Sequence, residues 1–204
     1  KRKGLILGFH GCDKTLRDEV VSKKGVIIEP SNNTYDWLGG GAYFWENNKT
    51  RAMDFAHHLL KCPPKNKKHK ITTPAVLGAV IDLGNCLDLL DSEFLDVLKV
   101  GYDLLLKSKS KFGLKIPENK PVGTGGDLLL RHLDCAVIES IHQFNRDLKK
   151  TEFDSVRGVF FEGNDLYPSA GFKEKNHIQI AIRNPNCIKG YFIPRDLDAN
   201  FTKP

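Results

Sequence analysis

Gly39-Gly40-Gly41-Ala42-Tyr43-Phe44-Trp45 joins three consecutive glycines to a short aromatic run. Consecutive glycines favour a turn, and aromatic side chains favour a strand. Shortly after this segment, Lys49–Lys61 places its apolar residues mostly on one side of a helix. A turn, a strand and an amphipathic helix are therefore predicted in this order.

Outward from this segment, the sequence predicts strands toward both ends of the chain and long helices in the middle. Because the elements do not alternate one by one, a doubly wound parallel sheet is not expected. The expected fold class is α+β, with two longer helices inserted at about 91–150 between two strand-rich halves. The predicted strands are Leu5–Phe9, Val26–Glu29, Ala42–Trp45, Ala75–Leu83, Val156–Phe161, Ile178–Ile182 and Tyr191–Ile193. The predicted helices are Asp13–Lys24 with Asp13 as N-cap, Lys49–Lys61, Glu93–Leu106 and Leu128–Leu148.

Length and composition favour a single folded domain over 1–204. The chain has 204 residues, of which 40% are hydrophobic and 27% are charged. These values exclude a mainly disordered chain, a collagen-like chain and a coiled coil. No apolar run approaches the ~18 residues that a membrane span needs, and the N-terminal apolar run is too short for a signal peptide. We therefore expect no membrane partner.

The five cysteines form an odd, scattered set without a C-x-x-C pair. Such a set predicts no disulfide framework, and a reducing compartment, the cytoplasm, fits it best. His57, His58 and Cys62 are close in sequence, but further ligands are not visible nearby. Since zinc sites usually show four ligands in pairs, no metal is expected.

The net charge of +6 and the pI of about 9.0 favour anionic partners. Five lysines lie between Lys61 and Pro74, a stretch that predicts a loop. This loop fits either a solvated basic surface or a contact with nucleic acid or phosphate. The phosphate loop of nucleotide hydrolases, the dinucleotide-binding glycine motif, the zinc-protease motif and the hydrolase nucleophile elbow are all absent.

Polar or aromatic groups stand beside glycines or strands in three distant places. His10-Gly11 is predicted to follow the first strand as a turn, Tyr43-Phe44 follows the triple glycine, and Gln179 lies in a late strand. A ligand approaches the backbone closely where glycine leaves space. The same residues also fit structural roles: a capping or core histidine, core aromatics and a tight turn.

The order of these segments resembles that of the ADP-ribosyltransferases of the diphtheria-toxin and poly(ADP-ribose) polymerase type. That family has His-Gly on its first core strand, then a G-x-G-x-Tyr-Phe segment, and an acidic residue that opens a later strand. The segments Gly39–Phe44, Gly158–Glu162 and His177–Pro185 carry the likeness here. The resemblance covers most of the chain and is closest to a little-characterised bacterial branch found among toxin and phage-defence proteins.

The resemblance implies a split β-sheet core and NAD as the substrate. His10 would bind a hydroxyl of the adenosine ribose, the backbone of Gly11 would hold the nicotinamide carboxamide, and Tyr43 would stack on the nicotinamide ring. The other implied contacts with the nucleotide are Gly41, Phe44 and Ser169. Asp36 and Trp37 would border the pocket, and Arg51 would either meet a phosphate or form part of the surface.

One position departs from the family. Strand-to-strand alignment places Gln179 where the polymerases have glutamate, and a neutral amide cannot supply the charge of a carboxylate. Losing one such electrostatic group costs about 10²–10³ in rate, so transfer of single ADP-ribose units is expected rather than chain building. Glu162 and Glu174, on the loop before that strand, are the alternative sources of a carboxylate.

Three functions remain open on the sequence. The first is a mono-ADP-ribosyltransferase, with His10, Tyr43 and Gln179 as catalytic residues, which modifies a protein or a nucleic acid as a bacterial toxin or defence effector. An antitoxin or regulatory protein would be a further partner. The second is a catalytically weak module that binds NAD or ADP-ribose, and the third is a basic nucleic-acid-binding protein without NAD chemistry.

Overall fold

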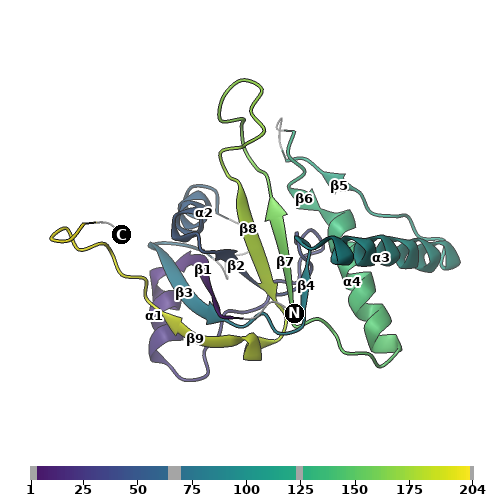
Figure 1. The fold of residues 1–204 in the computed structure, drawn as a ribbon, viewed down its shortest axis with the longest axis horizontal. Helices are drawn as coiled ribbons and strands as arrows, with labels where there is room; N and C mark the ends of the chain where they lie inside the picture. Colours follow the sequence, from purple (N-terminus) through teal and green to yellow (C-terminus); the bar gives the residue numbers. More distant parts are fainter. Residues whose placement is uncertain (1–3, 64–69, 123–125, 203–204) are drawn as a thin grey trace.

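The computed structural model of the chain describes residues 4–63, 70–122 and 126–202. Within these residues, four α-helices accompany one seven-stranded sheet and a two-stranded hairpin, which confirms the α+β class (Figure 1). The helices are α1 (Lys14–Ser22), α2 (Lys49–Lys61), α3 (Ser92–Lys111) and α4 (His132–Asp147). The strands of the sheet are β1 (Ile6–Asp13), β2 (Ala42–Glu46), β3 (Pro74–Ile81), β4 (Cys86–Asp88), β7 (Ser155–Phe160), β8 (His177–Ile182) and β9 (Ile188–Phe192). The hairpin is formed by β5 (Asn119–Lys120) and β6 (Leu130–Arg131).

The strand order of the sheet is β4-β7-β8-β2-β1-β3-β9. Neighbouring strands are antiparallel except β4 and β7, which are parallel. A mainly antiparallel sheet agrees with the expectation that this is not a doubly wound fold. The strands nearest the middle, β8, β2 and β1, come from opposite ends of the chain.

Helices cover both faces of the sheet. On one face, Val20 of α1 packs in a core cluster with Phe44 and Leu77. On the other face, Ala52 of α2 packs against Phe9 and Trp45 over the β1 half of the sheet. Over the β7–β8 half of that second face lies a third cluster, which includes Ile138, Ile141, Val156 and Ala181.

The two long helices predicted in the middle of the chain are present as α3 and α4, and a two-stranded hairpin that was not predicted accompanies them. α3 and α4 lie together to one side of the sheet (Figure 1), and the β5–β6 hairpin comes between them in sequence. Gly101 of α3 lets the helices approach closely, because a Cβ there would lie 2.5 Å from Cγ1 of Ile141. α3 is longer than the predicted helix, and α4 begins later than predicted, after Arg131.

Two predictions about the first half of the chain are wrong. His10-Gly11 does not form a turn, because β1 continues through both residues to Asp13, which caps α1 as predicted. Val26–Glu29 forms no strand, although Ile28 is buried in the core. A loop segment that sends a β-branched side chain into the core looks apolar in the same way as a strand, so hydrophobicity alone misassigned it. The central part of the basic loop Lys61–Pro74 lies outside the described residues.

No helix among the described residues is long and apolar enough to cross a membrane.

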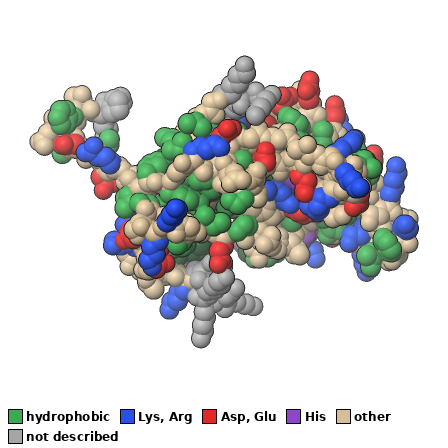
Figure 2. Space-filling view, turned by 90° about the horizontal axis from the view of Figure 1, so that it is seen from below, with side chains coloured by type: hydrophobic (Ala, Val, Ile, Leu, Met, Phe, Trp, Pro, Cys, Tyr) green, Lys and Arg blue, Asp and Glu red, His purple; other side chains and the backbone are tan. Residues whose placement is uncertain are grey.

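Lys and Arg side chains are mixed with acidic ones at the end of the molecule where Figure 1 has α3 and α4 (Figure 2). Hydrophobic side chains gather more toward the middle and the opposite end in this view. The insertion nevertheless also exposes large hydrophobic side chains, among them Val100, Phe112 and Leu114.

Candidate functional site

The His-Gly, Tyr-Phe and late-strand segments of the likeness lie on the adjacent strands β1, β2 and β8. In the register of the sheet, Phe9 of β1 is opposite Trp45 of β2, and Trp45 is opposite Gln179 of β8. β1 and β2 pair at only two positions, Gly8–Glu46 and Phe9–Trp45. The motif residues thus come together at the centre of the sheet, close to where β1 and β2 stop pairing.

The predicted trio of His10, Tyr43 and Gln179 does not share one face. Tyr43 is opposite Ala181, and strand alternation places Tyr43 and Gln179 on the face covered by α2 and α4. His10 follows Phe9 and therefore lies on the other face, with its ring 5.8 Å from that of Phe44. The His10 ring is nevertheless linked to β2, because its Nδ1 lies 2.7 Å from the carbonyl oxygen of Tyr43.

Tyr43 is held firmly by its own surroundings. Its hydroxyl accepts a hydrogen bond from the amide of Leu38 and donates one to the carbonyl of Gly39. The ring packs against the α4-side core, and burial raises the pKa of the phenol well above its ordinary value. Tyr43 therefore fixes the glycine turn to β2, and the described structure does not present its ring as a free stacking surface.

Glycine is required at Gly11 and Gly41 by close packing within the protein. A Cβ on Gly11 would collide with the main-chain carbonyl oxygen of Ala52 in α2. A Cβ on Gly41 would lie 3.0 Å from the carbonyl oxygen of Ile182. The predicted contacts of these glycines with a nucleotide stay predictions. Phe44 is fully buried in the core.

The β7–β8 loop projects beyond the sheet (Figure 1) and separates the two candidate glutamates. Glu174 is exposed and accepts hydrogen bonds from Asn164 only within the loop. Ser169 is also exposed, with a positive φ of 63°. Neither residue contacts the strands that carry the motifs through a hydrogen bond among the described residues.

Glu162 differs from Glu174 because it faces α2. Its Oε2 accepts a 2.8 Å hydrogen bond from Nη2 of Arg51, and the two side chains are only 14% and 12% exposed. The Arg51 guanidinium lies 5.8 Å from the centre of the Trp45 ring. This ion pair therefore places a carboxylate beside the row that contains Gln179, which is half-buried and opposite Trp45.

His177, which opens β8, lies among aromatic rings next to this ion pair. Its ring is 5.8 Å from Phe160, 6.2 Å from Trp37 and 6.4 Å from Trp45. Nδ1 lies 2.5 Å from the carbonyl oxygen of Lys175, whereas Nε2 is buried without a hydrogen-bond partner. Burial lowers the pKa of the imidazole, so it is neutral at pH 7.

The insertion adds a cation to the same place. Arg131 of β6 stacks its guanidinium 4.5 Å from the Trp37 ring centre and 5.0 Å from that of Phe160. The indole of Trp37 donates a hydrogen bond to the carbonyl of Leu129 in the same segment. Arg131 also pairs with Asp134. We call Trp37, Trp45, Arg51, Arg131, Phe160, Glu162 and His177 the His177 cluster.

Sequence reasoning missed most of this cluster. Arg51 and Trp37 were lesser candidates, Glu162 was one of two alternatives, and His177, Trp45 and Arg131 were not singled out as site residues. The likeness gave no direct signal for His177, because that family has an acidic residue where the late strand opens, whereas β8 begins with a histidine. Arg131 gives no signal either, since only the folded insertion brings it to Trp37.

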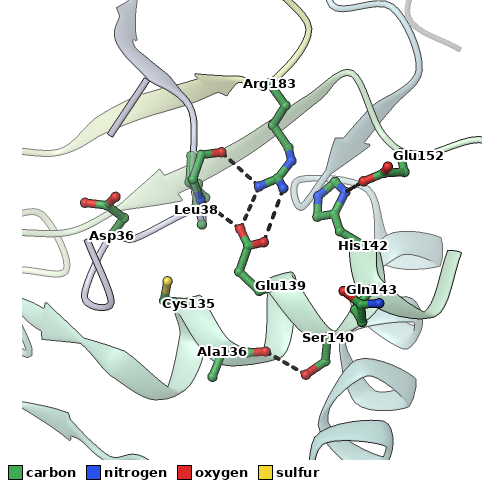
Figure 3. Close-up of polar contacts among 12 residues, drawn as sticks. Asp36, Leu38, Cys135, Ala136, Glu139, Ser140, His142, Gln143, Glu152 and Arg183 are labelled. Carbon is green, nitrogen blue, oxygen red and sulfur yellow. Dashed lines mark hydrogen bonds and ion pairs between the residues drawn. The ribbon is translucent and has the colours of Figure 1, made fainter. Parts of the chain in front are cut away.

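A cavity of about 990 Å³ lies at the opposite end of β2 and β8, between α4 and the loop before β2. Figure 3 shows its wall, where the Glu139 carboxylate meets the Arg183 guanidinium. Glu139 Oε1 accepts hydrogen bonds from Arg183 and from the amide of Gly40. These contacts tie α4 to the glycine turn and lower the pKa of Glu139 against the effect of its burial.

Other side chains offer little as metal ligands or nucleophiles. His57, His58 and Cys62 are exposed along and after α2. No group of three or more His, Cys, Asp and Glu side chains suited to a metal ion occurs in the described parts of the chain. Burial raises the pKa of the thiols of Cys12, Cys86 and Cys135 to about 11, which keeps them protonated.

Comparison with known proteins leaves the family open. No family model matches the chain, and no solved structure matches it. The uncharacterized protein MJ0359 of Methanocaldococcus jannaschii is 23% identical over 198 residues, which cover 89% of this chain and 83% of that protein. Its name states no activity, so the function must be argued from the residues of this chain.

Proposed function

We propose that the protein is a mono-ADP-ribosyltransferase that moves ADP-ribose from NAD to a macromolecular acceptor. The observation that carries the proposal is the row Phe9–Trp45–Gln179 across β1, β2 and β8, with the largely buried Glu162–Arg51 ion pair beside it. The His-Gly, Tyr-Phe and late-strand segments of the resemblance are thus neighbours, and a carboxylate is near them.

In this reaction, the bond between the nicotinamide nitrogen and ribose C1′ breaks, and neutral nicotinamide leaves with the bonding electrons. Positive charge develops on the ribose ring until an acceptor oxygen or nitrogen attacks C1′ and loses its proton. A fixed carboxylate stabilises such a charge, and removing one group of this kind costs about 10²–10³ in rate. Glu162 supplies that charge in our proposal.

Gln179 and the two aromatic motif residues take different parts. The Gln179 amide makes no side-chain hydrogen bond within the described part of the chain and is available to a ribose hydroxyl. His10 and Tyr43 are positioning residues here, because the ring of one bonds the main chain of the other across β1 and β2. NAD is the co-substrate, and the proposal needs no metal.

The test is incubation of the protein with labelled NAD and, in separate reactions, protein, DNA and RNA. The proposal expects release of nicotinamide and label on one acceptor class, without polymer. Glu162→Gln should lower the rate at least about a hundredfold, whereas Glu174→Gln in the same loop should leave it unchanged. Absence of both nicotinamide release and acceptor labelling by the wild-type protein would refute the proposal.

A second candidate, an NAD- or ADP-ribose-binding module without turnover, is favoured by two observations. Gln179 carries no charge, and the hydroxyl of Tyr43 is fully engaged with Leu38 and Gly39. This alternative predicts binding of NAD by calorimetry without release of nicotinamide. It also predicts that Gln179→Glu creates activity, whereas our main proposal expects activity before that substitution.

A further inference from the structure

The His177 cluster contains an unusual concentration of unpartnered polar atoms. Of the seven buried side-chain nitrogen or oxygen atoms without a hydrogen bond in the described residues, four belong to it. They are Nε1 of Trp45, Nε of Arg51, Nε of Arg131 and Nε2 of His177. Buried polar groups normally have partners, so four such atoms in one connected group point to a ligand that supplies them.

The hydrogen-bond character of each atom can be assigned. The indole and the two guanidinium nitrogens carry hydrogens and can only donate. His177 Nδ1 lies 2.5 Å from the carbonyl oxygen of Lys175, which has no hydrogen, so Nδ1 must be the protonated nitrogen. Nε2 of the neutral ring is then an acceptor. His177 is 6% exposed and Trp45 4% exposed, so water reaches these atoms poorly.

The charges around the ring come from three different elements. Arg51 of α2, Arg131 of β6 and Glu162 of the loop after β7 act electrostatically on the His177 ring. Glu162 is shared between Arg51 and Lys175, and Arg131 has Asp134 as its own partner. Each arginine therefore retains an Nε–H that no carboxylate satisfies.

A complementary ligand must combine two features. It needs anionic oxygen atoms for the three donors, and it needs a hydroxyl that donates to His177 Nε2. A fully ionised phosphate has no hydrogen to donate and would leave the imidazole unsatisfied, and a neutral sugar would leave the guanidinium groups unsatisfied. A sugar phosphate meets both needs, and Arg is well suited to phosphate oxygens.

We propose that the His177 cluster binds the ribose phosphate part of a nucleotide, with a ribose hydroxyl donating to His177 Nε2 and phosphate oxygens accepting from Arg51 and Arg131. This inference rests on the proposed function only for the choice of NAD and ADP-ribose as ligands. It gives the insertion a role, because β6 supplies Arg131. The ribose phosphate can reach His177 only if the Arg51–Glu162 ion pair separates. The phosphate compensates for this loss because its oxygen atoms replace Glu162 as the partner of Arg51.

¹⁵N NMR of the wild-type protein, labelled with ¹⁵N at its histidine rings, tests the hydrogen bond to His177 Nε2 without any substitution. The free protein should show His177 as the Nδ1–H tautomer with a bare Nε2. Titration with ADP-ribose should shift the Nε2 resonance of His177 upfield, as a lone pair that gains a hydrogen bond does, and leave that of exposed His57 in place. An unchanged His177 Nε2 signal in the presence of saturating ADP-ribose would overturn the proposal.

Calorimetry with ADP-ribose provides the second test. Arg131→Gln and His177→Asn should each weaken binding about tenfold or more, since loss of one charge-assisted or buried hydrogen bond is of this size. Arg146→Gln, on the exposed end of α4 where Arg146 pairs with Glu152, is the matched control and should bind as the wild type does. Circular dichroism identifies folded variants. Wild-type affinity in both folded cluster variants would contradict the site.

The two proposals fail in different ways. Binding through the His177 cluster without release of nicotinamide from NAD would overturn the transferase and retain the site. Turnover of NAD would retain the transferase. If the His177 Nε2 resonance then stayed unchanged with ADP-ribose, and the Arg131 and His177 variants bound ADP-ribose as the wild type does, the site would be overturned. Absence of any binding of ADP-ribose or NAD would overturn both.

Discussion

Glu162 and Arg51 form a largely buried ion pair, 2.8 Å from Oε2 to Nη2, that joins the loop after β7 to α2. The two residues are far apart in sequence, and the pair crosses the end of the sheet at which β8 begins. It holds a carboxylate beside the Trp45–Gln179 row and also acts electrostatically on the His177 ring. The proposed chemistry and the stability of this region therefore depend on the same contact.

Removal of the Glu162 charge should destabilise the fold. Glu162→Gln leaves the Arg51 guanidinium largely buried with a weaker partner, and the free energy of unfolding should fall by about 1–3 kcal/mol. Urea denaturation monitored by circular dichroism measures this change. Glu174→Gln is the control, because Glu174 is exposed. Equal stability of the two variants would show that the Arg51–Glu162 contact is not maintained in solution.

Replacement of Tyr43 by Phe should also lower stability. The hydroxyl satisfies both the amide of Leu38 and the carbonyl of Gly39, and Phe leaves these two groups without a partner. The expected loss in the free energy of unfolding is about 1–3 kcal/mol. A loss below about 0.5 kcal/mol, the range of ordinary surface substitutions, would mean that the hydroxyl does not hold the glycine turn.

Gly11 should not tolerate a methyl group. The Cβ of Gly11→Ala would collide with the Ala52 carbonyl, and main-chain atoms of a packed helix cannot move aside cheaply. Overpacking of this kind costs about 1–3 kcal/mol. Gly190→Ala in β9 is the matched control, since no atom lies within 4 Å of its new Cβ. Thermal unfolding of both variants makes the comparison, and a stable Gly11→Ala protein would contradict the packing of α2 on β1.

Stability should fall in mild acid because of His142. Its side chain is 0% exposed on α4, and burial lowers its pKa from 6.5 to about 4. The unfolded chain therefore binds a proton at a higher pH than the folded protein does, and stability decreases as the pH drops from 6.5 toward 4. The full effect is about 3 kcal/mol.

The pH dependence can be traced to His142 by substitution. His142→Leu removes the titrating group and should flatten most of the fall in stability between pH 6.5 and 4, measured by denaturation at several pH values. A smaller slope should remain, because burial also lowers the pKa of His177. If the free energy of unfolding of His142→Leu fell with pH as steeply as that of the wild type, groups other than His142 would cause the pH dependence.

The sequence indicated the elements better than it indicated their contacts. Local signals were sufficient for α2 and β2, where apolar spacing and an aromatic run matched the structure. They failed for His10-Gly11, because a glycine at the end of an apolar run suggests a turn. In the structure this glycine lies within a strand and is needed there because α2 approaches it closely. They failed for Val26–Glu29 because Ile28, although part of a loop, is buried in the core as a strand residue would be.

The site was less predictable than the fold because long-range pairing decides it. The resemblance pointed to β1, β2 and β8, which are neighbours in the sheet, but strand alternation separates His10 from Tyr43 and Gln179, and a family motif does not reveal this. The choice between Glu162 and Glu174 depends on which side of a projecting loop faces α2. Arg131 follows Trp37 by 94 residues in the sequence and reaches its ring only through the folded insertion.

The rate of nicotinamide release from labelled NAD by the wild-type protein, compared with that of Glu162→Gln, tests the central claim most directly. The account predicts release and acceptor labelling by the wild type, a rate at least about a hundredfold lower in Glu162→Gln, and an unchanged rate in Glu174→Gln. No release by the wild type with any of the three acceptor classes, or equal rates in the wild type and Glu162→Gln, would contradict it.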